Sequence, residues 1–155
     1  KKRLKNFKYK NKIIKLSKEY REGKITTENN QSFNENLDIL NELDPKVKEQ
    51  LVGALRGVKK TQVRDVTVAY EPVWAIGTNN PATPDDVLSA KIFIRKIISD
   101  LYDRKTADSV LVLYGGSTNR KNAASFIKEG GADGLLVGGA SLNVEEFISM
   151  TRSGT

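Results

Sequence analysis

Glu71 is the side chain in this sequence best placed to do chemistry, because a strand is expected just before it and a loop just after it. Residues 66–70 read V-T-V-A-Y, which predicts a buried strand. The following loop contains an aromatic residue, Trp74, and a glycine, Gly77, and it ends at Thr83. An acid at a strand end beneath such a loop is the arrangement expected of a general base under a lid. The alternative is a strand-to-helix connection whose acid faces water.

Two glycine-rich loops follow the next two predicted strands. They read Gly-Gly-Ser at residues 115–117 and Gly-Gly-Ala-Ser at residues 138–141. Ligands of parallel β/α folds bind at the carboxyl ends of the strands, where glycine loops expose backbone N–H groups to a bulky anion. Each pair of glycines alone could form a tight turn. Two such loops after consecutive strands favour a phosphate site, to which Ser117 would add a donor unless it caps the next helix.

Two absences restrict the chemistry. The 155 residues contain no Cys and no His. The first absence excludes disulfides, thiol nucleophiles and thiolate metal sites, and it favours a reducing, cytoplasmic setting. The second excludes Ser-His triads and His-based zinc sites. Carboxylates, lysines, hydroxyls and backbone groups remain, and we predict no metal and no cofactor.

The net charge of +7 is placed unevenly. Residues 1–24 contain 11 of the 26 basic residues and 2 of the 19 acidic ones. We interpret this segment as a solvated basic face, because it has few aromatic residues and no nucleic-acid motif, so nucleic acid is not an expected partner. No apolar run is long enough for a membrane span and no secretory signal is visible. The chain begins with Lys rather than Met, from which we expect a fragment or a processed chain.

From residue 66 onward the pattern of strand, loop and helix occurs three times, which is typical of β/α units around a parallel sheet. The later strands are predicted over residues 109–114 and 134–137, and the continuous apolar run of the first of them suggests a sheet covered on both faces. Helices are expected to begin at Asn119 and Asn143. Another helix is expected earlier, from Asp44 and Pro45, with a stripe formed by Val47, Leu51, Leu55 and Val58.

The clearest predicted helix follows the loop after Glu71. Thr83 is expected to cap it, with Pro84 at its first position and Asp86 completing a capping box. Its buried stripe is predicted to contain Val87, Ala90, Phe93, Ile94, Ile97, Ile98 and Leu101, with Arg95, Lys96 and Asp100 on the other side.

Three segments of the chain read A-Y-E-P-V-W-A-I-G-T (residues 69–78), Y-G-G-S (114–117) and L-V-G-G-A-S-L (136–142). In this order and at this spacing they resemble the signatures of the triose-phosphate isomerase family. The resemblance runs from Val47 to Met150. It implies an α/β fold of parallel (β/α) units. The chain would form an incomplete TIM barrel with about four of the eight units, and these would come from the C-terminal half of the barrel.

The resemblance also implies a division of the chain, which we predict to be a single partial TIM-barrel domain over residues 1–155. Residues 1–24 would be a basic N-terminal segment and residues 25–44 a polar insertion. Residues 45–155 would be the β/α units that contain the family motifs.

The same resemblance implies a reaction, the glycolytic interconversion of glyceraldehyde 3-phosphate and dihydroxyacetone phosphate. Glu71 would be the base that moves a proton between adjacent carbons through an enediolate. Because a Glu base under a closing loop is itself known from this family, that role is not independent of the resemblance. The phosphate would be bound by Gly77, Ser117, Gly138 and Gly139. The lid would consist of Pro72, Val73, Trp74, Ala75, Ile76 and Thr78, and Tyr114 would help to hold it closed.

The sequence departs from the family in features that belong to the first half of the family's barrel. The family barrel has eight units in roughly 250 residues, with an electrophilic His and an Asn-x-Lys segment, and this chain has no His. Residues 6–8 (N-F-K) are similar to the Asn-x-Lys segment. Alternatively, residues 13–16 and 21–24 are similar to the fifth strand and its turn, and we favour this second alignment. In the lid, Asn79, Asn80 and Pro81 replace the usual Gly and Lys-Thr hinge, and Pro81 is expected to stiffen it.

Three hypotheses follow. The first is an isomerase sequence that acts on a triose phosphate and needs an absent half, which is either on a second chain or lost by truncation. Its expected partner is a second copy, as in the family's homodimer, or a complementary N-terminal half-barrel. The second is a non-catalytic remnant that binds sugar phosphates or takes part in assembly. A nucleic-acid binder built on residues 1–24 ranks third, and a membrane partner is not expected.

Overall fold

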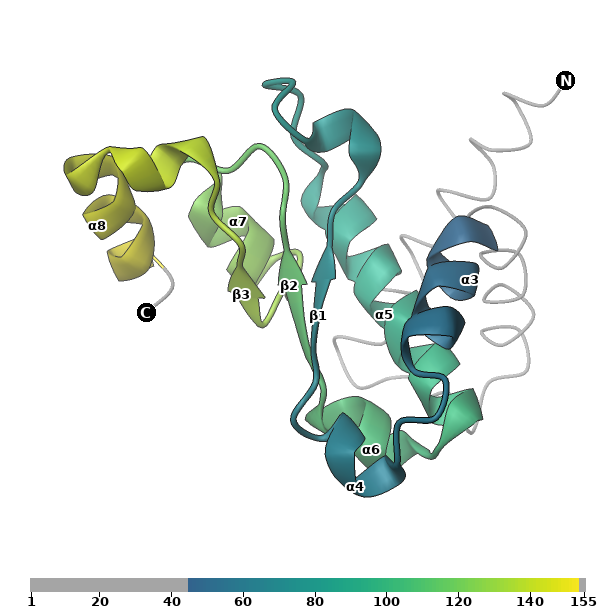
Figure 1. Cartoon of the computed structure of the whole chain (residues 1–155). Helices are drawn as coiled ribbons and strands as arrows, with labels where there is room; N and C mark the ends of the chain where they lie inside the picture. Colours follow the sequence, from purple (N-terminus) through teal and green to yellow (C-terminus); the bar gives the residue numbers. More distant parts are fainter. Residues whose placement is uncertain (1–44, 154–155) are drawn as a thin grey trace, which may run out of the picture.

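The computed structural model describes residues 45–153, which form a three-stranded parallel sheet and its helices (Figure 1). The elements are α3 (Pro45–Ala54), α4 (Lys60–Val63), β1 (Thr67–Tyr70), η1 (Val73–Ala75), α5 (Pro84–Leu101), α6 (Arg104–Ser109), β2 (Leu111–Tyr114), α7 (Ala123–Lys128), β3 (Gly134–Leu135), η2 (Gly139–Leu142) and α8 (Val144–Ser153). The predictions for residues 1–44, including the Asp44 cap, the insertion over residues 25–44 and the two alternative alignments, lie outside the described residues.

The sheet has the order β1-β2-β3, and all of its pairs are parallel. Tyr70 of β1 pairs with Tyr114 of β2, which in turn pairs with Leu135 of β3. The carboxyl ends of the three strands therefore lie along the same edge of the sheet. The predicted succession of parallel β/α units is confirmed.

The strands are shorter than the apolar runs that predicted them. Ser109 was expected to open the second strand, but it is the last residue of α6, and β2 begins at Leu111. The sequence alone did not predict α6, whose first turn is capped by the Asp103 carboxylate, the acceptor of the Thr106 N–H at 2.7 Å. β3 ends at Leu135 rather than at residue 137, although the Leu136 N–H still donates to the Tyr114 carbonyl at 2.9 Å.

The sheet is covered on one face, and the expectation of helices on both faces is wrong for these residues. Val112 and Tyr114 point into the core, and Val68 and Tyr70 of β1 pack against it. Side chains alternate along a strand, so Thr67 and Ala69 lie on the opposite face and are exposed. On that face Leu111 is 51% exposed. The expected burial of the whole first strand is therefore also wrong.

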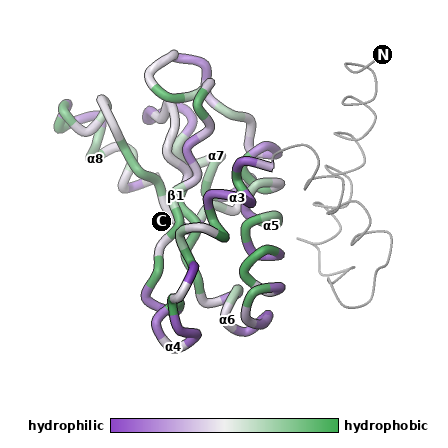
Figure 2. The backbone as a smooth tube through the Cα atoms, turned by 45° about the vertical axis from the view of Figure 1, so that its right-hand side comes forward, coloured by the Kyte–Doolittle hydropathy of each residue, from purple (hydrophilic) through white to green (hydrophobic). Residues whose placement is uncertain are grey.

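Helix α5 connects the two halves of the core. It packs with α3 and β1 around Ile94 and Ile98 at one end, and Val87 joins the cluster of Tyr114 and Phe126 at the other. The predicted capping box is present, with the Thr83 hydroxyl accepting from the Asp86 N–H at 3.2 Å. Figure 2 shows both hydrophobic and hydrophilic residues along α5.

Two details of the predicted α5 stripe differ from the structure. Leu101 was placed in the buried stripe, but at the last residue of the helix it is 43% exposed. Ala90 is half-buried, whereas Leu88 and Ile92, which were not in the predicted stripe, are buried. A period of 3.6 residues gives the direction of a face but not its width, and α5 packs against elements on both sides of β2.

The remaining helices begin or end where their sequences allow it. α3 begins at Pro45 as predicted and buries Leu51, and the chain turns at Gly57, which has a φ of +79°. α4 was not predicted. α7 begins at Ala123 rather than at Asn119, because the residues between them form a turn in which the Asn119 N–H donates to the Asn122 Oδ1 at 2.8 Å. α8 begins after Asn143, whose side chain caps it as predicted by accepting from the Glu146 N–H at 2.9 Å.

Candidate functional site

Glu71 follows the last residue of β1, and its side chain lies against the first glycine loop. A Cβ atom at Gly115 would be 2.8 Å from the Glu71 Cγ and 3.0 Å from its Oε1, so this approach requires a residue without a side chain. The Gly115 N–H donates to the Tyr70 carbonyl at 2.9 Å, which continues the β1–β2 pairing and fixes the loop beside the acid. The Glu71 carboxylate forms no hydrogen bond or ion pair with any residue in 45–153.

A cavity of about 690 Å³ lies at the carboxyl edge of the sheet and joins the elements that sequence reasoning had selected separately. Glu71 lines it, with Gly77 above and the two glycine loops at residues 115–117 and 138–139. Its other lining residues are Ile76, Asn79, Pro81, Thr118, Asn119, Leu136, Val137 and Ala140. The structure thus brings together the acid, the loop glycine and both expected phosphate loops.

The segment over residues 72–82, called the lid below, is attached to the first glycine loop near its start. Residues Val73–Ala75 form the short helix η1. The Ala75 carbonyl accepts both the Ser117 N–H, at 2.9 Å, and the Ser117 hydroxyl, at 2.8 Å. Ser117 therefore uses its two donors to hold the lid in this structure and does not cap α7.

The other end of the lid is attached to Tyr114. The Ala82 N–H donates to the Tyr114 hydroxyl at 2.9 Å, inside the core cluster that contains both residues. Tyr114 is fully buried, and its ring lies 4.4 Å from that of Phe126. Burial raises the pKa of the Tyr114 hydroxyl, and so does the nearby Asp86 carboxylate, while the Ala82 N–H works in the opposite direction.

Gly116 must be a glycine for a steric reason. A Cβ atom there would be 2.2 Å from the Tyr114 hydroxyl oxygen. Gly77, in the lid, adopts a φ of +65°, which is the left-handed region that favours glycine. The sequence indicated both positions by residue type, but the contacts that make them necessary are visible only in the fold.

Several backbone donors at the cavity have no partner among the described residues. Within residues 45–153 no acceptor is found for the N–H groups of Gly77, Gly116 and Gly138. At Gly138 and Gly139 a Cβ would meet no atom within 4 Å, so the backbone of this second loop borders open space. Unpaired N–H groups at glycines around one cavity are suited to an anion with several oxygens.

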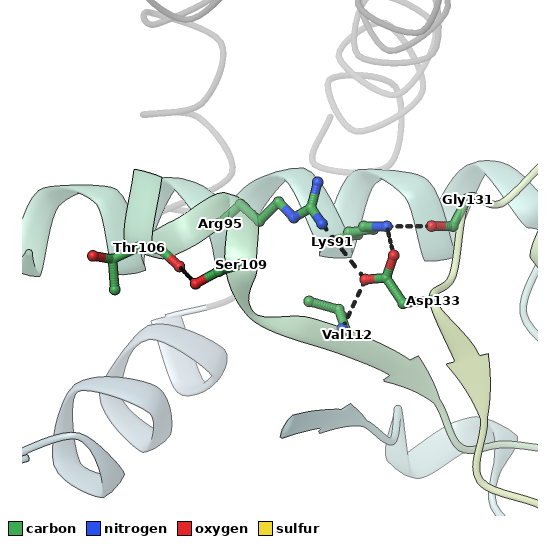
Figure 3. Close-up of polar contacts among 7 residues, drawn as sticks. All are labelled: Lys91, Arg95, Thr106, Ser109, Val112, Gly131 and Asp133. Atoms are coloured by element: carbon green, nitrogen blue, oxygen red, sulfur yellow. Dashed lines mark hydrogen bonds and ion pairs between the residues drawn. The ribbon is translucent and has the colours of Figure 1, made fainter. Parts of the chain in front are cut away.

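A charged cluster that sequence reasoning missed fixes the segment before β3, which leads to the second glycine loop (Figure 3). Asp133, just before β3, accepts from the Val112 N–H at 2.9 Å and from the Lys91 ammonium at 2.6 Å, and the Arg95 guanidinium lies 3.6 Å away. Lys91 also donates to the Gly131 carbonyl at 2.5 Å. Burial lowers the pKa of Lys91, although its hydrogen bond to Asp133 opposes this. The i,i+4 cations on α5 were visible in the sequence, but their partner 42 residues away from Lys91 was not.

Glu71 also borders a second, smaller hollow of about 310 Å³ on the other side of β1. Lys46 and Gln50 of α3 line it, together with Val68 and Val73. Glu71 therefore lines both the cavity under the lid and a groove beside β1, which is an edge strand of the sheet within residues 45–153.

Residues 45–153 contain no group of three or more His, Cys, Asp or Glu side chains that could hold a metal ion. In the same part of the chain, no helix combines the length and the apolar character needed to cross a membrane.

The fold and the site define a class of protein. It has a parallel β/α fold, with an acid, a loop and two glycine turns at the carboxyl edge of the sheet. The family model described as triosephosphate isomerase matches residues 30–154, most of the chain. This chain therefore belongs to the triosephosphate isomerase family, and its described part is a partial α/β fold of that family. The match begins at residue 30, inside the stretch that was expected to be an insertion.

Curated relatives agree with this assignment. The chain is 48% identical over 102 residues to the triosephosphate isomerase of Saccharopolyspora erythraea, which covers 66% of this chain and 39% of that protein. It is 45% identical over 108 residues to the enzyme of the same name from Thermus thermophilus, covering 70% of this chain and 43% of the relative. The chain thus spans about two fifths of the length of the curated relatives that it matches.

Proposed function

We propose that this chain contributes the proton-transfer base and the phosphate loops of a triose-phosphate isomerase site. The observation that carries the proposal is that one cavity is lined by Glu71, by Gly77 of the lid and by both glycine loops. Its substrates would be glyceraldehyde 3-phosphate and dihydroxyacetone phosphate.

The phosphate group would be bound by backbone donors. Gly77 and Gly138 offer N–H groups that have no partner within residues 45–153, and Gly139 lies beside Gly138 at the start of η2. Ser117 would serve this site in two ways, by holding the lid through Ala75 and by turning its hydroxyl towards the phosphate when that contact opens. Backbone donors fixed before binding need no rearrangement to stabilise the negative charge.

Glu71 would act as the base. Its carboxylate would take a proton from the carbon next to the substrate carbonyl, leaving an enediolate, and would return it to the adjacent carbon, while the substrate's hydroxyl proton moves to the former carbonyl oxygen. The lid residues Pro72, Val73, Trp74, Ala75, Ile76 and Thr78 would cover the reacting atoms, with Tyr114 holding the lid through Ala82. Exclusion of water strengthens the electrostatic interactions inside such a site and protects a reactive intermediate.

A specific observation supports a second candidate, a non-catalytic module that binds sugar phosphates. The chain contains no His, and no lysine or arginine is among the described residues that line the cavity. No cationic or imidazole group in the described residues therefore faces the substrate carbonyl to polarise it, and proton removal by Glu71 alone would be slow. Residues 1–44, a complementary N-terminal half-barrel or a second subunit of a homodimer would have to supply that group.

An isomerisation assay with glyceraldehyde 3-phosphate, combined with binding of a triose phosphate measured by calorimetry, separates the candidates. Turnover above the buffer rate that is lost in Glu71→Gln supports the isomerase. Binding that is weakened by Gly139→Ala, without turnover, supports the binding module. Absence of both turnover and binding would falsify the proposal. A cytoplasmic setting, no membrane or nucleic-acid partner and no cofactor remain our predictions for this protein.

A further inference from the structure

We propose that Pro81 is a positioning residue, which holds the lid over the cavity before any ligand is bound. The proposal concerns this chain without ligand and does not depend on the reaction that the site performs. It rests on three features of the lid: two anchors, an internal brace and a short stiff connection between them.

The two anchors attach the lid to the same strand-loop segment. Near the start of the lid, the Ala75 carbonyl accepts two hydrogen bonds from Ser117. At its end, the Ala82 N–H donates to the Tyr114 hydroxyl, and Ala82 is itself buried in the core. Opening the lid at this end would break the hydrogen bond between the Ala82 N–H and the Tyr114 hydroxyl, which costs free energy because the hydroxyl is buried.

The brace is the Thr78 side chain. Its hydroxyl donates to the Trp74 carbonyl at 2.8 Å and accepts from the Asn80 N–H at 3.2 Å. These bonds connect the first turn of the lid to its tip, where Gly77 and Asn79 have φ angles of +65° and +57°. Residues 74–80 are therefore tied together and would move as a unit.

Pro81 is the single residue between the brace at Asn80 and the anchor at Ala82. Its ring fixes its φ and restricts Asn80 to extended conformations. When the Ala82 N–H leaves the Tyr114 hydroxyl, the ring still restricts the torsions through which residues 74–80 could swing away, so it reduces the number of open conformations. The Gly77 N–H is consequently kept at the cavity before a ligand binds.

Replacing Pro81 by Ala restores the lost torsions without removing any hydrogen bond, because proline has no N–H to donate. Substitutions of this kind act mainly on the less ordered state. We expect Pro81→Ala to raise the population of the open lid about two- to fivefold, from the usual effect of a proline on backbone freedom.

Amide hydrogen exchange followed by NMR on the full chain, without phosphate or other anions, tests this. The Ala82 amide should exchange more slowly than the Gly116 amide, which has no acceptor in the described residues. In Pro81→Ala its exchange should become two- to fivefold faster. The Leu136 amide, bonded to the Tyr114 carbonyl, reports global unfolding and should be unaffected. Pro84→Ala, at the first position of α5, is the matched proline control and should leave Ala82 exchange unchanged.

Three results would overturn the proposal. One is an Ala82 amide that exchanges as fast as that of Gly116 in the unmodified chain. Another is a Pro81→Ala variant with unchanged Ala82 exchange. The third is an equal acceleration of Ala82 and Leu136, which would mean that Pro81 stabilises the whole fold rather than the position of the lid.

Discussion

At the scale of single residues, Tyr114 connects the lid to the core, and its buried hydroxyl makes this connection sensitive to alkali. Burial raises the pKa of Tyr114 above its usual value of 10.0. In the unfolded chain the hydroxyl loses its proton near pH 10, whereas in the folded chain it keeps the proton to higher pH. The stabilisation is therefore complete below pH 10 and is lost as the pH rises through the folded pKa.

We expect the free energy of unfolding, measured by urea titration at several pH values, to fall above pH 10. Tyr114→Phe should reduce this dependence, because the titrating group is gone, and should also lower stability at pH 7 by about 1–3 kcal/mol through the unpaired Ala82 N–H. An identical alkaline slope in the variant and the unmodified chain would mean that Tyr114 does not titrate differently in the two states.

Two glycines of the site should differ in their response to the addition of one methyl group. Gly116→Ala would place a carbon 2.2 Å from the Tyr114 hydroxyl oxygen, so we expect a loss of about 1–3 kcal/mol from overpacking. Gly139→Ala meets no atom within 4 Å and should change stability by less than about 0.5 kcal/mol. Thermal or urea unfolding of both variants checks this, and equal losses would contradict the contact.

Residue types predicted the participants of the site better than their interactions. The acid, the loop glycine and the two glycine pairs could be selected from the sequence, because few residue types allow such loops. The attachment of the lid by Ser117 could not be predicted, because its acceptor at Ala75 is 42 residues away. Asp133 was missed for the same reason, since its partners lie on α5 and β2.

At the scale of secondary-structure elements, two glycines near α3 show how the same substitution can have opposite effects. Gly53 lies inside the helix with open space around its Cα, and Gly57 turns the chain with a φ of +79°. Gly53→Ala should stabilise the protein by about 0.5–1 kcal/mol through the higher helix propensity of Ala. Gly57→Ala should cost about 1 kcal/mol or more, because Ala disfavours the left-handed region.

Circular dichroism and urea unfolding of both variants measure these changes. A destabilising Gly53→Ala would indicate a close neighbour that the structure does not contain. Equal effects of the two substitutions would contradict the assigned end of α3.

The existence of elements was more predictable than their bounds. Apolar runs and caps predicted all three strands and the helices α3, α5, α7 and α8. The ends depended on competing local bonds. Asp103 caps the start of α6, the Ser109 hydroxyl donates to the Thr106 carbonyl at its end, and the turn at Asn119 delays the start of α7 to Ala123. α4 has four residues and α6 has six, too few for a periodic signal.

At the scale of the whole molecule, the described part has an uncovered apolar sheet face. Leu111 is 51% exposed there, and Leu136, just after β3, is 46% exposed. The apolar run of β2 predicted burial on both faces, as in a complete parallel fold. The run does form the predicted strand, but residues 45–153 do not contain the elements that would cover its second face.

We expect this face to bind an apolar dye such as anilinonaphthalene sulfonate. Leu111→Gln should reduce the fluorescence of the bound dye, because it interrupts the exposed apolar surface. Leu101→Gln, at a similarly exposed leucine on the last residue of α5, is the control and should have a smaller effect. Equal reductions, or none, would show that the sheet face is not the dye-binding surface.

The most direct test of the central claim, that Glu71 is a base in a phosphate-binding cavity, is proton exchange in heavy water. Dihydroxyacetone phosphate is incubated with the chain in D₂O, and deuterium incorporation at the carbon next to the carbonyl is followed by NMR. This reports proton removal even where complete turnover is slow. We predict incorporation faster than in buffer for the unmodified chain and a return to the buffer rate in Glu71→Gln. Equal incorporation in the chain, the variant and the buffer would contradict the role of Glu71.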